Sequence, residues 1–249
     1  MVQIASKVES LRNAAADRDQ RMRDVHDVRS GDVDTVMPGA MPDAWPKPIV
    51  ANMIDTTARD IAEVMGAMPS INCASGVITT DKAKRFSSKR TKIANYYVQK
   101  CSELMAGAQV EFCDHYNSLG MAIYVVEPDF ETKQPRIRVE NPIGVYPEMD
   151  LYGKVRSYSK VWRDEAINLV AKFPHLMRVL QSNETGGQGS LTQGWAQREI
   201  EVVKYCDAEQ IVMFLPNHGN QIIDRMPNPL GKVYVAIARR PGYDSEIRG

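Results

Sequence analysis

Residues 46–65 read PKPIVANMIDTTARDIAEVM. The two prolines favour an extended start, because proline lacks a backbone N–H and disfavours a helical conformation in the residue before it. No glycine or proline interrupts the rest of the stretch, and mostly apolar residues recur there at the three- and four-residue spacing of an α-helix. This stripe consists of Ile49, Met53, Ile54, Thr57, Ala58, Ile61 and Met65. The stretch therefore predicts an amphipathic helix that packs on the core of the main domain.

The segment before this helix is charged at first and then rich in proline. A charged helix with a thin apolar seam, interrupted by Arg18, is predicted at residues 4–28, and a proline-rich link follows it. Because so narrow a seam buries little surface, we expect this helix to be peripheral and to dock on a partner. We therefore predict a charged helix and proline-rich arm at residues 1–45 and an α+β domain at residues 46–249.

The main domain continues with further helical patterns. A short β-prone run is predicted at residues 69–73, and Asp81 is a plausible cap for a long helix that extends to about residue 108. A second helical run at residues 110–119 stops at Gly120. Glycine is a common helix terminator, because it adopts a left-handed conformation without steric cost.

After Gly120 the sequence pattern is typical of β-strands, with β-branched residues and an alternation of apolar and polar residues. Strands are expected at residues 121–126, 136–140, 154–163, 198–207, 210–215, 221–225 and 233–239. A short helix at residues 164–181, split at Pro174, interrupts them, and residues 216–219 predict a hairpin turn. The predicted fold class is α+β, with N-terminal helices followed by a mostly antiparallel β-sheet.

The composition is that of an ordinary folded protein of 249 residues, with 43% hydrophobic and 25% charged residues. Thirty-one basic residues balance thirty-one acidic ones, so no field of the whole chain attracts DNA or an anionic membrane. No apolar run approaches the roughly 20 residues of a membrane span, and the first ten residues lack a signal-peptide core. We expect the product to stay in the compartment where it is made.

No constellation of residues predicts catalysis, a cofactor or a metal site. The four cysteines form no CxxC pair, and Cys113 near His115 is better explained as a buried thiol. The glycine-rich residues 186–194 are predicted to be a surface loop, since they lack the lysine and hydroxyl residue that end a phosphate-binding loop. Two pairs of carboxylates lie among turn residues, where acids are normally solvated: Glu127 with Asp129, and Glu148 with Asp150. The sequence thus predicts a protein that is not an enzyme.

One cluster of charges does suggest a contact surface. Six positive charges fall within eleven residues at the start of the long helix, where they oppose the helix dipole. They are Lys82, Lys84, Arg85, Lys89, Arg90 and Lys92. Three interpretations stay open: a solvated helix face, an ion-paired contact with an adjacent subunit, and a contact with DNA phosphates. Direct binding of DNA is the least favoured of the three, because Phe86 is the only aromatic residue interleaved with these charges and proteins that bind single strands without sequence preference use several.

Several stretches follow one another in an order that is similar to one family. The helical PIVANMIDT (residues 48–56) precedes the long helix, and NSLGMA (residues 117–122) is a helix-then-glycine step into a strand. A strand ending in a proline turn, RIRVENPIGVYP (residues 136–147), then leads to a strand containing YSKVW (residues 158–162). Taken together they resemble the N-terminal arm and wing of the portal protein of tailed bacteriophages, the ring at the capsid vertex through which DNA is packaged and released.

This resemblance implies a structural role without enzymatic activity or cofactor. It implies a homo-oligomeric ring, typically twelve-fold, that contacts the major capsid protein, the terminase and a head-to-tail adaptor. Double-stranded DNA would pass through the ring without sequence-specific contacts, and no membrane would be involved. The subunit would be made in the host cytoplasm and would end in the virion.

The resemblance also implies stem, clip and crown regions that line the tunnel and that this sequence does not contain. We therefore expect the chain to be part of a longer polypeptide, and to be monomeric or weakly associated on its own. Two alternatives stay open. One is another virion component, such as a head-completion or minor capsid protein. The other is a metal-dependent nuclease, which would need carboxylates that converge from several strands.

Overall fold

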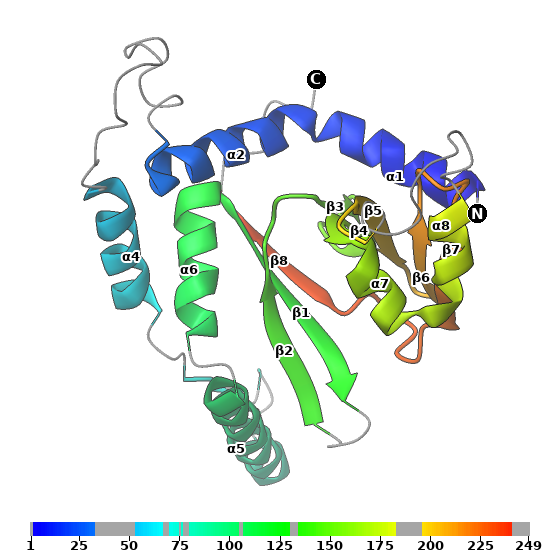
Figure 1. The fold of residues 1–249 in the computed structure, drawn as a ribbon. Coiled ribbons are helices and arrows are strands. Elements are labelled where there is room, and N and C mark those ends of the chain that lie inside the picture. The colour runs from blue at the N-terminus through cyan, green and yellow to red at the C-terminus, as the bar shows by residue number, and fades with distance from the viewer. Residues whose placement is uncertain are drawn as a thin grey trace. The chain divides into compact units, whose positions relative to one another are not determined.

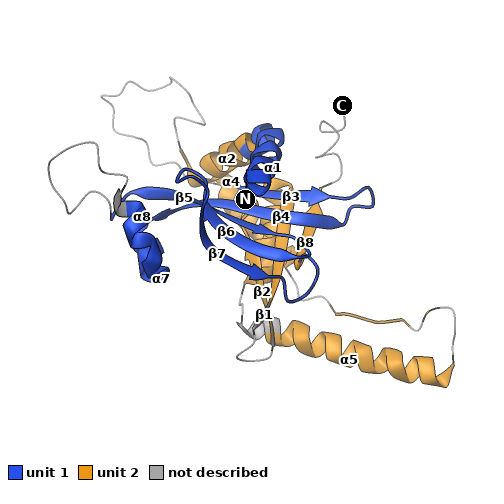
Figure 2. Ribbon diagram, turned by 90° about the vertical axis from the view of Figure 1, so that its right-hand side faces the viewer, with its two compact units in different colours: residues 1–19, 143–233 blue, residues 20–142, 234–249 orange. Residues whose placement is uncertain are grey.

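The computed structural model describes residues 2–32, 53–66, 70–74, 76, 80–104, 107–129, 134–182 and 196–240. Its helices precede two antiparallel sheets, which confirms the predicted α+β class (Figure 1). The chain divides into two compact units (Figure 2). Unit 1 comprises Met1–Asp19 and Ile143–Val233, and unit 2 comprises Gln20–Pro142 and Tyr234–Gly249. The predicted boundary between an arm and a main domain stays a prediction, and the proline-rich part of that arm lies outside the described residues.

Unit 1 is built on a five-stranded antiparallel sheet with the order β3-β4-β5-β6-β7. Its strands are β3 (Val145–Met149), β4 (Val155–Glu165), β5 (Glu199–Cys206), β6 (Gln210–Leu215) and β7 (Gln221–Pro227). After β4 the chain forms α7 (Ala166–Lys172), a short 3-10 turn (Pro174–Leu176) and α8 (Met177–Ser182). The predicted split at Pro174 and the hairpin turn between β6 and β7 are both confirmed.

Both faces of this sheet are covered from within the unit. Val202 joins a buried cluster with Leu169 and Leu176 from the helical segment after β4. Val203 joins a second cluster with Val8 of α1 (Val2–Ala14). Because neighbouring residues of a strand point to opposite faces, these helices cover opposite sides of the sheet. The expectation that the first helix depends on a partner for burial is therefore wrong for α1, which packs on the sheet of its own chain.

Unit 2 contains a three-stranded antiparallel sheet with the order β2-β1-β8. Its strands are β1 (Met121–Asp129), β2 (Gln134–Glu140) and β8 (Val235–Arg239), so the sheet is completed by a strand that follows the whole of unit 1. Its helices are α2 (Ala16–Ser30, from residue 20 onward), α4 (Met53–Met65), α5 (Asp81–Leu104) and α6 (Ala108–Leu119). Gly120 ends α6 in a left-handed conformation, as predicted, and its carbonyl accepts a hydrogen bond from the Arg240 N–H.

Three local predictions are wrong, each for an identifiable reason. The helix predicted at residues 4–28 is two helices, separated at Ala15. Residues 70–74 form no strand, because the N–H groups of Ile71 and Cys73 bond to side chains of α5 instead. Strand β3 was not predicted, since Pro147 suggested a turn; β3 is an edge strand, where a proline costs no ladder hydrogen bond.

Gly144 occupies a position in unit 1 that a larger residue would not fit. It adopts φ +77°, and a Cβ at this position would lie 2.5 Å from the carbonyl oxygen of Val161. We expect Gly144→Ala to lower the free energy of unfolding of unit 1 by about 2–4 kcal/mol, since both strain and a backbone clash result. Gly153, with φ +78° and no atom within 4 Å of its Cβ position, provides the matched control. In urea titrations Gly153→Ala should lower the free energy of unfolding by only about 1–2 kcal/mol. Equal losses for the two alanine variants would contradict the close approach of Gly144 to the Val161 carbonyl.

The contact between α1 and β3 includes an ion pair whose contribution depends on pH. Lys7 Nζ lies 2.6 Å from Glu148 Oε2, and this hydrogen bond lowers the pKa of Glu148 below its usual 4.5. A carboxyl group whose pKa is lowered in the folded state stabilises the fold at pH values above its usual pKa. This stabilisation is lost as the pH falls through the lowered pKa. Both side chains are about one-third exposed, so we expect the ion pair to contribute less than about 1 kcal/mol to the free energy of unfolding. In urea titrations at neutral and acidic pH, Glu148→Gln should abolish this pH-dependent stabilisation and Lys7→Met should remove most of it, since Ser157 and Arg156 also lower the pKa of Glu148. The double variant should lose no more than Glu148→Gln.

Candidate functional site

The predicted basic cluster lies in the first half of α5, a helix of 24 residues. The Ala83 N–H bonds to Thr80 Oγ1 at 3.3 Å, and the Lys84 N–H bonds to the Thr80 carbonyl at 2.9 Å. Thr80 therefore caps the helix in place of the expected Asp81. The cap fixes where the helix begins, and hence which charges lie in its first turns.

One face of α5 is occupied by the segment at residues 70–74. Asn95 accepts a hydrogen bond from the Ile71 N–H at 2.9 Å and donates one to the Ile71 carbonyl at 2.8 Å. Thr91 accepts from the Cys73 N–H at 3.0 Å, and Ser87 donates to the Cys73 carbonyl. Ser87, Thr91 and Asn95 recur every four residues and so line a single face. This polar face of α5 has its partner within unit 2.

A second face of α5 has apolar residues that remain exposed. Phe86 is 57% exposed, and Ile93 and Tyr97 are exposed as well. At 3.6 residues per turn these three side chains lie within about 40° of one another around the helix axis. They point about 140° away from Thr91, and hence away from the segment at residues 70–74. Tyr96, also exposed, lies beside them with its ring edge-on to that of Tyr97. We call Phe86, Ile93, Tyr96 and Tyr97 the aromatic stripe of α5.

All six predicted basic residues of α5 are exposed, and none forms an ion pair with another described residue. By helical geometry Lys82, Lys89 and Arg90 flank the aromatic stripe, whereas Lys84, Arg85 and Lys92 point to other sides of the helix. The Arg90 guanidinium carbon lies 4.5 Å from the centroid of the Phe86 ring, which is a cation–π distance. The structure thus combines three of the predicted charges with the stripe, and this combination was not expected.

Helix α4 buries a different face from the predicted one, although Ala58 of the predicted stripe is half-buried. Ala62 is fully buried, and a Cβ on Gly66 would lie 2.9 Å from the Cα of Val110 in α6. The small residues of α4 therefore approach α6, and its large apolar residues point outward. Met53 is 76% and Val64 82% exposed. We call the exposed apolar residues the outward face of α4; they are Met53, Ile54, Ile61, Val64 and Met65.

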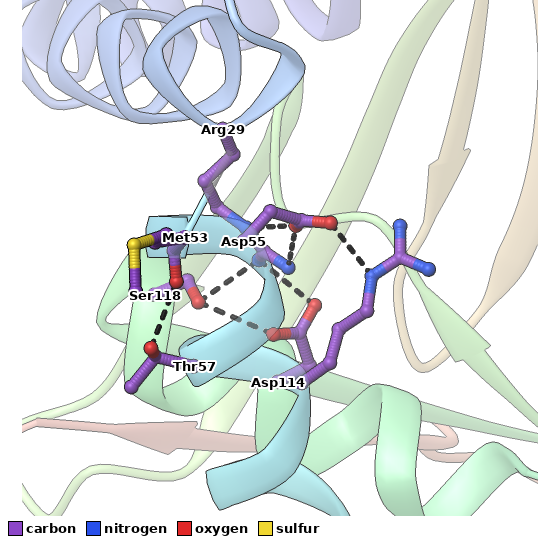
Figure 3. A network of polar contacts seen from close by, with 7 residues as sticks. Arg29, Met53, Asp55, Thr57, Asp114 and Ser118 are labelled. Carbon is purple, nitrogen blue, oxygen red and sulfur yellow. Dashed lines mark hydrogen bonds and ion pairs between the residues drawn. The ribbon is translucent and has the colours of Figure 1, made fainter. Parts of the chain in front are cut away.

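A polar network holds α4 in this orientation (Figure 3). Arg29 of α2 donates hydrogen bonds to Asp55 Oδ1 of α4 at 2.7 and 2.9 Å. The same guanidinium donates to Asp114 Oδ2 and Ser118 Oγ of α6, each at 2.9 Å. One cation therefore joins three helices of unit 2. This network was not predicted, although Asp114 and Ser118, four residues apart on one face of α6, were a possible signal in the sequence.

The same three helices border an open groove of about 450 Å³. Its lining is mostly apolar and includes part of the outward face of α4. The apolar residues are Val25, Val28, Ile54, Ala58 and Ile61. Exposed apolar surface therefore continues from α4 onto α2.

The residues weighed as possible chemical groups have local roles. Cys113 is buried, and burial raises the pKa of its thiol, which disfavours a reactive thiolate. Glu127 pairs with Arg138, and Asp150 accepts hydrogen bonds from the Tyr152 and Lys154 N–H groups. Across the described ranges, no three histidine, cysteine or acidic side chains gather where they could hold a metal ion. No described helix is long and apolar enough to cross a lipid bilayer.

The chain matches no protein-family model, and a search of curated proteins finds no match.

Proposed function

We propose that this chain is a structural subunit of a portal ring of a tailed bacteriophage, located at the capsid vertex. The observation that carries the proposal is the order of the stretches that resemble the portal wing. Where these stretches fall on described residues, they lie on α4 (from residue 53 onward), α5, the α6–Gly120–β1 step, β2 with β3, and β4. The ring would form the passage for DNA packaging and ejection, and a platform for the terminase and the tail adaptor.

The two exposed helix surfaces favour a role in assembly. A ring subunit needs two different surfaces, because head-to-tail contacts close only when each subunit offers one surface to each neighbour. Unit 2 presents a basic surface with aromatic residues on α5 and an apolar surface on α4. Large exposed apolar patches commonly mark interaction sites. A subunit of this kind binds neighbours and the capsid shell and needs no catalytic group of its own.

Immunogold electron microscopy of phage particles tests the proposal. An antibody raised against the purified chain, applied to tail-free capsids of the phage that encodes it, should label one vertex per capsid. Labelling over the whole shell would indicate a minor capsid protein, and absence of label from permeable capsids would contradict a virion role. A parallel assay for Mg²⁺-dependent cleavage of plasmid DNA by the purified chain should be negative; cleavage would favour the nuclease alternative.

A further inference from the structure

We propose that α5 of one copy packs its aromatic stripe and flanking cations on the outward face of α4 of a second copy. This inference rests on the proposed ring subunit and names the surfaces by which neighbouring subunits meet. Both surfaces belong to unit 2, and both are exposed in the single chain. The contact is heterologous, because the two surfaces differ, so every copy can bind one neighbour through each surface.

The apolar parts of the two surfaces match in length. Phe86 and Tyr97 are eleven residues apart on α5, which corresponds to about 16 Å along a helix axis. Ile54 and Met65 are also eleven residues apart on α4, so the two apolar rows are equally long. Packing one row on the other would remove from water the large side chains that the single chain leaves exposed, and this hydrophobic burial would drive association.

The charges of the two surfaces are complementary. Lys82, Lys89 and Arg90 flank the stripe of α5. By helical geometry the exposed Asp60 of α4 lies within about 40° of Met53 and Val64, and the single basic residue of α4, Arg59, is paired with Asp55 at 2.8 Å. The outward side of α4 is therefore acidic where that of α5 is basic. Complementary charges at the rim of an apolar contact fix its register and accelerate association.

The aromatic stripe also distinguishes a second copy from DNA as the occupant of this surface. Phosphate contacts would use the cations but would leave Phe86, Ile93 and Tyr97 in water. A protein surface with its own apolar row satisfies both parts of the α5 face. The acidic rim of α4 would repel phosphates, and it attracts the cations of α5.

Site-specific photo-crosslinking tests the contact in the complete chain. We would replace Phe86 by benzoylphenylalanine, mix isotopically labelled and unlabelled chains at high concentration, irradiate, and identify mixed-isotope peptides by mass spectrometry. The expected partner peptides contain residues 53–66. Benzoylphenylalanine at Tyr152, which is 90% exposed in a turn of unit 1, is the matched control and should not crosslink to this segment. Absence of intermolecular crosslinks from position 86, or crosslinks that avoid residues 53–66, would overturn the inference.

Charge exchange provides an independent test. The variant Lys89→Glu/Arg90→Glu and the variant Asp60→Lys should each weaken self-association about tenfold or more in sedimentation velocity experiments, because like charges then face each other. Combining all three substitutions in one chain should restore association. A mixture of the two variants should restore it as well, since α5 of each variant is then compatible with α4 of the other and the two kinds of chain can alternate. Failure of the combined variant to recover would contradict the pairing of these surfaces.

The outcomes separate this inference from the proposed function. If position 86 does not crosslink to α4 although one capsid vertex is labelled, the contact is wrong and the portal assignment stands. If the crosslink forms and no vertex is labelled, the contact stands and the portal assignment fails. Should Lys89→Glu/Arg90→Glu leave assembly unchanged and abolish DNA binding by the assembled protein, the α5 surface is a DNA contact and the inference is wrong.

Discussion

Replacing Arg18 by methionine is expected to lower the free energy of unfolding of unit 1 by about 3–5 kcal/mol. The Arg18 guanidinium is buried and donates to Asp19 Oδ1 at 2.6 Å and to the Val145 carbonyl at 2.8 Å. Asp19 is 2% exposed and accepts a second hydrogen bond from the Tyr146 hydroxyl at 2.7 Å. Without Arg18 the Asp19 carboxylate would remain buried with no cation to compensate its charge.

The control for this change is Arg23→Met in the exposed part of the same helix, which should alter stability by no more than about 0.5 kcal/mol. Urea titration and hydrogen exchange of β3 amides would measure both effects. The variant Arg18→Met/Asp19→Asn should be more stable than Arg18→Met alone, because it no longer buries an unpaired charge. A loss below about 1 kcal/mol for Arg18→Met would show that the network is solvated in solution.

Replacing Arg29 by methionine should destabilise unit 2 by about 2–3 kcal/mol, less than a fully buried pair because its partners are partly exposed. The Arg29 side chain is 15% exposed, and the change would leave Asp55 and Asp114 near each other without the cation they share. Because Arg29 joins α4 to α2 and α6, the loss should concentrate in α4. We expect amide exchange in α4 to accelerate more than exchange in β1.

Arg59→Met is the matched control, since Arg59 also pairs with Asp55 but is 71% exposed. It should cost no more than about 0.5 kcal/mol and should leave exchange in α4 nearly unchanged. If Arg59→Met and Arg29→Met have equal effects, or if α4 keeps its protection without Arg29, the network does not hold this helix.

Much of the fold could be predicted from local patterns. Gly120 ends α6 and β1 begins at the next residue, as predicted, because a glycine in the left-handed conformation leaves no alternative continuation of the helix. The strands of the five-stranded sheet after β3 were predicted from their β-branched and aromatic residues and from the turn residues between them, although their burial does not alternate strictly because both faces of the sheet are covered. The split at Pro174 likewise follows from the missing N–H of proline.

The errors concern long-range packing, which periodicity does not encode. Helix α4 has a clear apolar stripe, and the prediction placed that stripe in the core. In the structure a different face of α4, which carries small and polar residues, packs on its neighbours. Gly66 approaches Val110 closely, and Asp55 forms an ion pair with Arg29. In the same way Arg18 interrupts the seam of its helix for a reason visible only in three dimensions, since its partner Val145 is 127 residues away.

The candidate surface was predicted in part. The six cations of α5 could be identified from sequence because they are clustered in the chain. Their combination with Phe86 and Ile93 on one face required knowledge of which side of α5 the segment at residues 70–74 occupies. The outward face of α4, the other half of the proposed contact, was not predicted, since all of its residues except Val64 were assigned to the core.

Electron microscopy of the whole product of the gene that encodes this chain, purified at low salt, would show directly whether the protein forms a portal ring. We expect closed rings with a central channel, in which α5 of each subunit lies against α4 of its neighbour. Monomers, closed two-fold dimers or open filaments as the dominant species in the same images would contradict a portal ring.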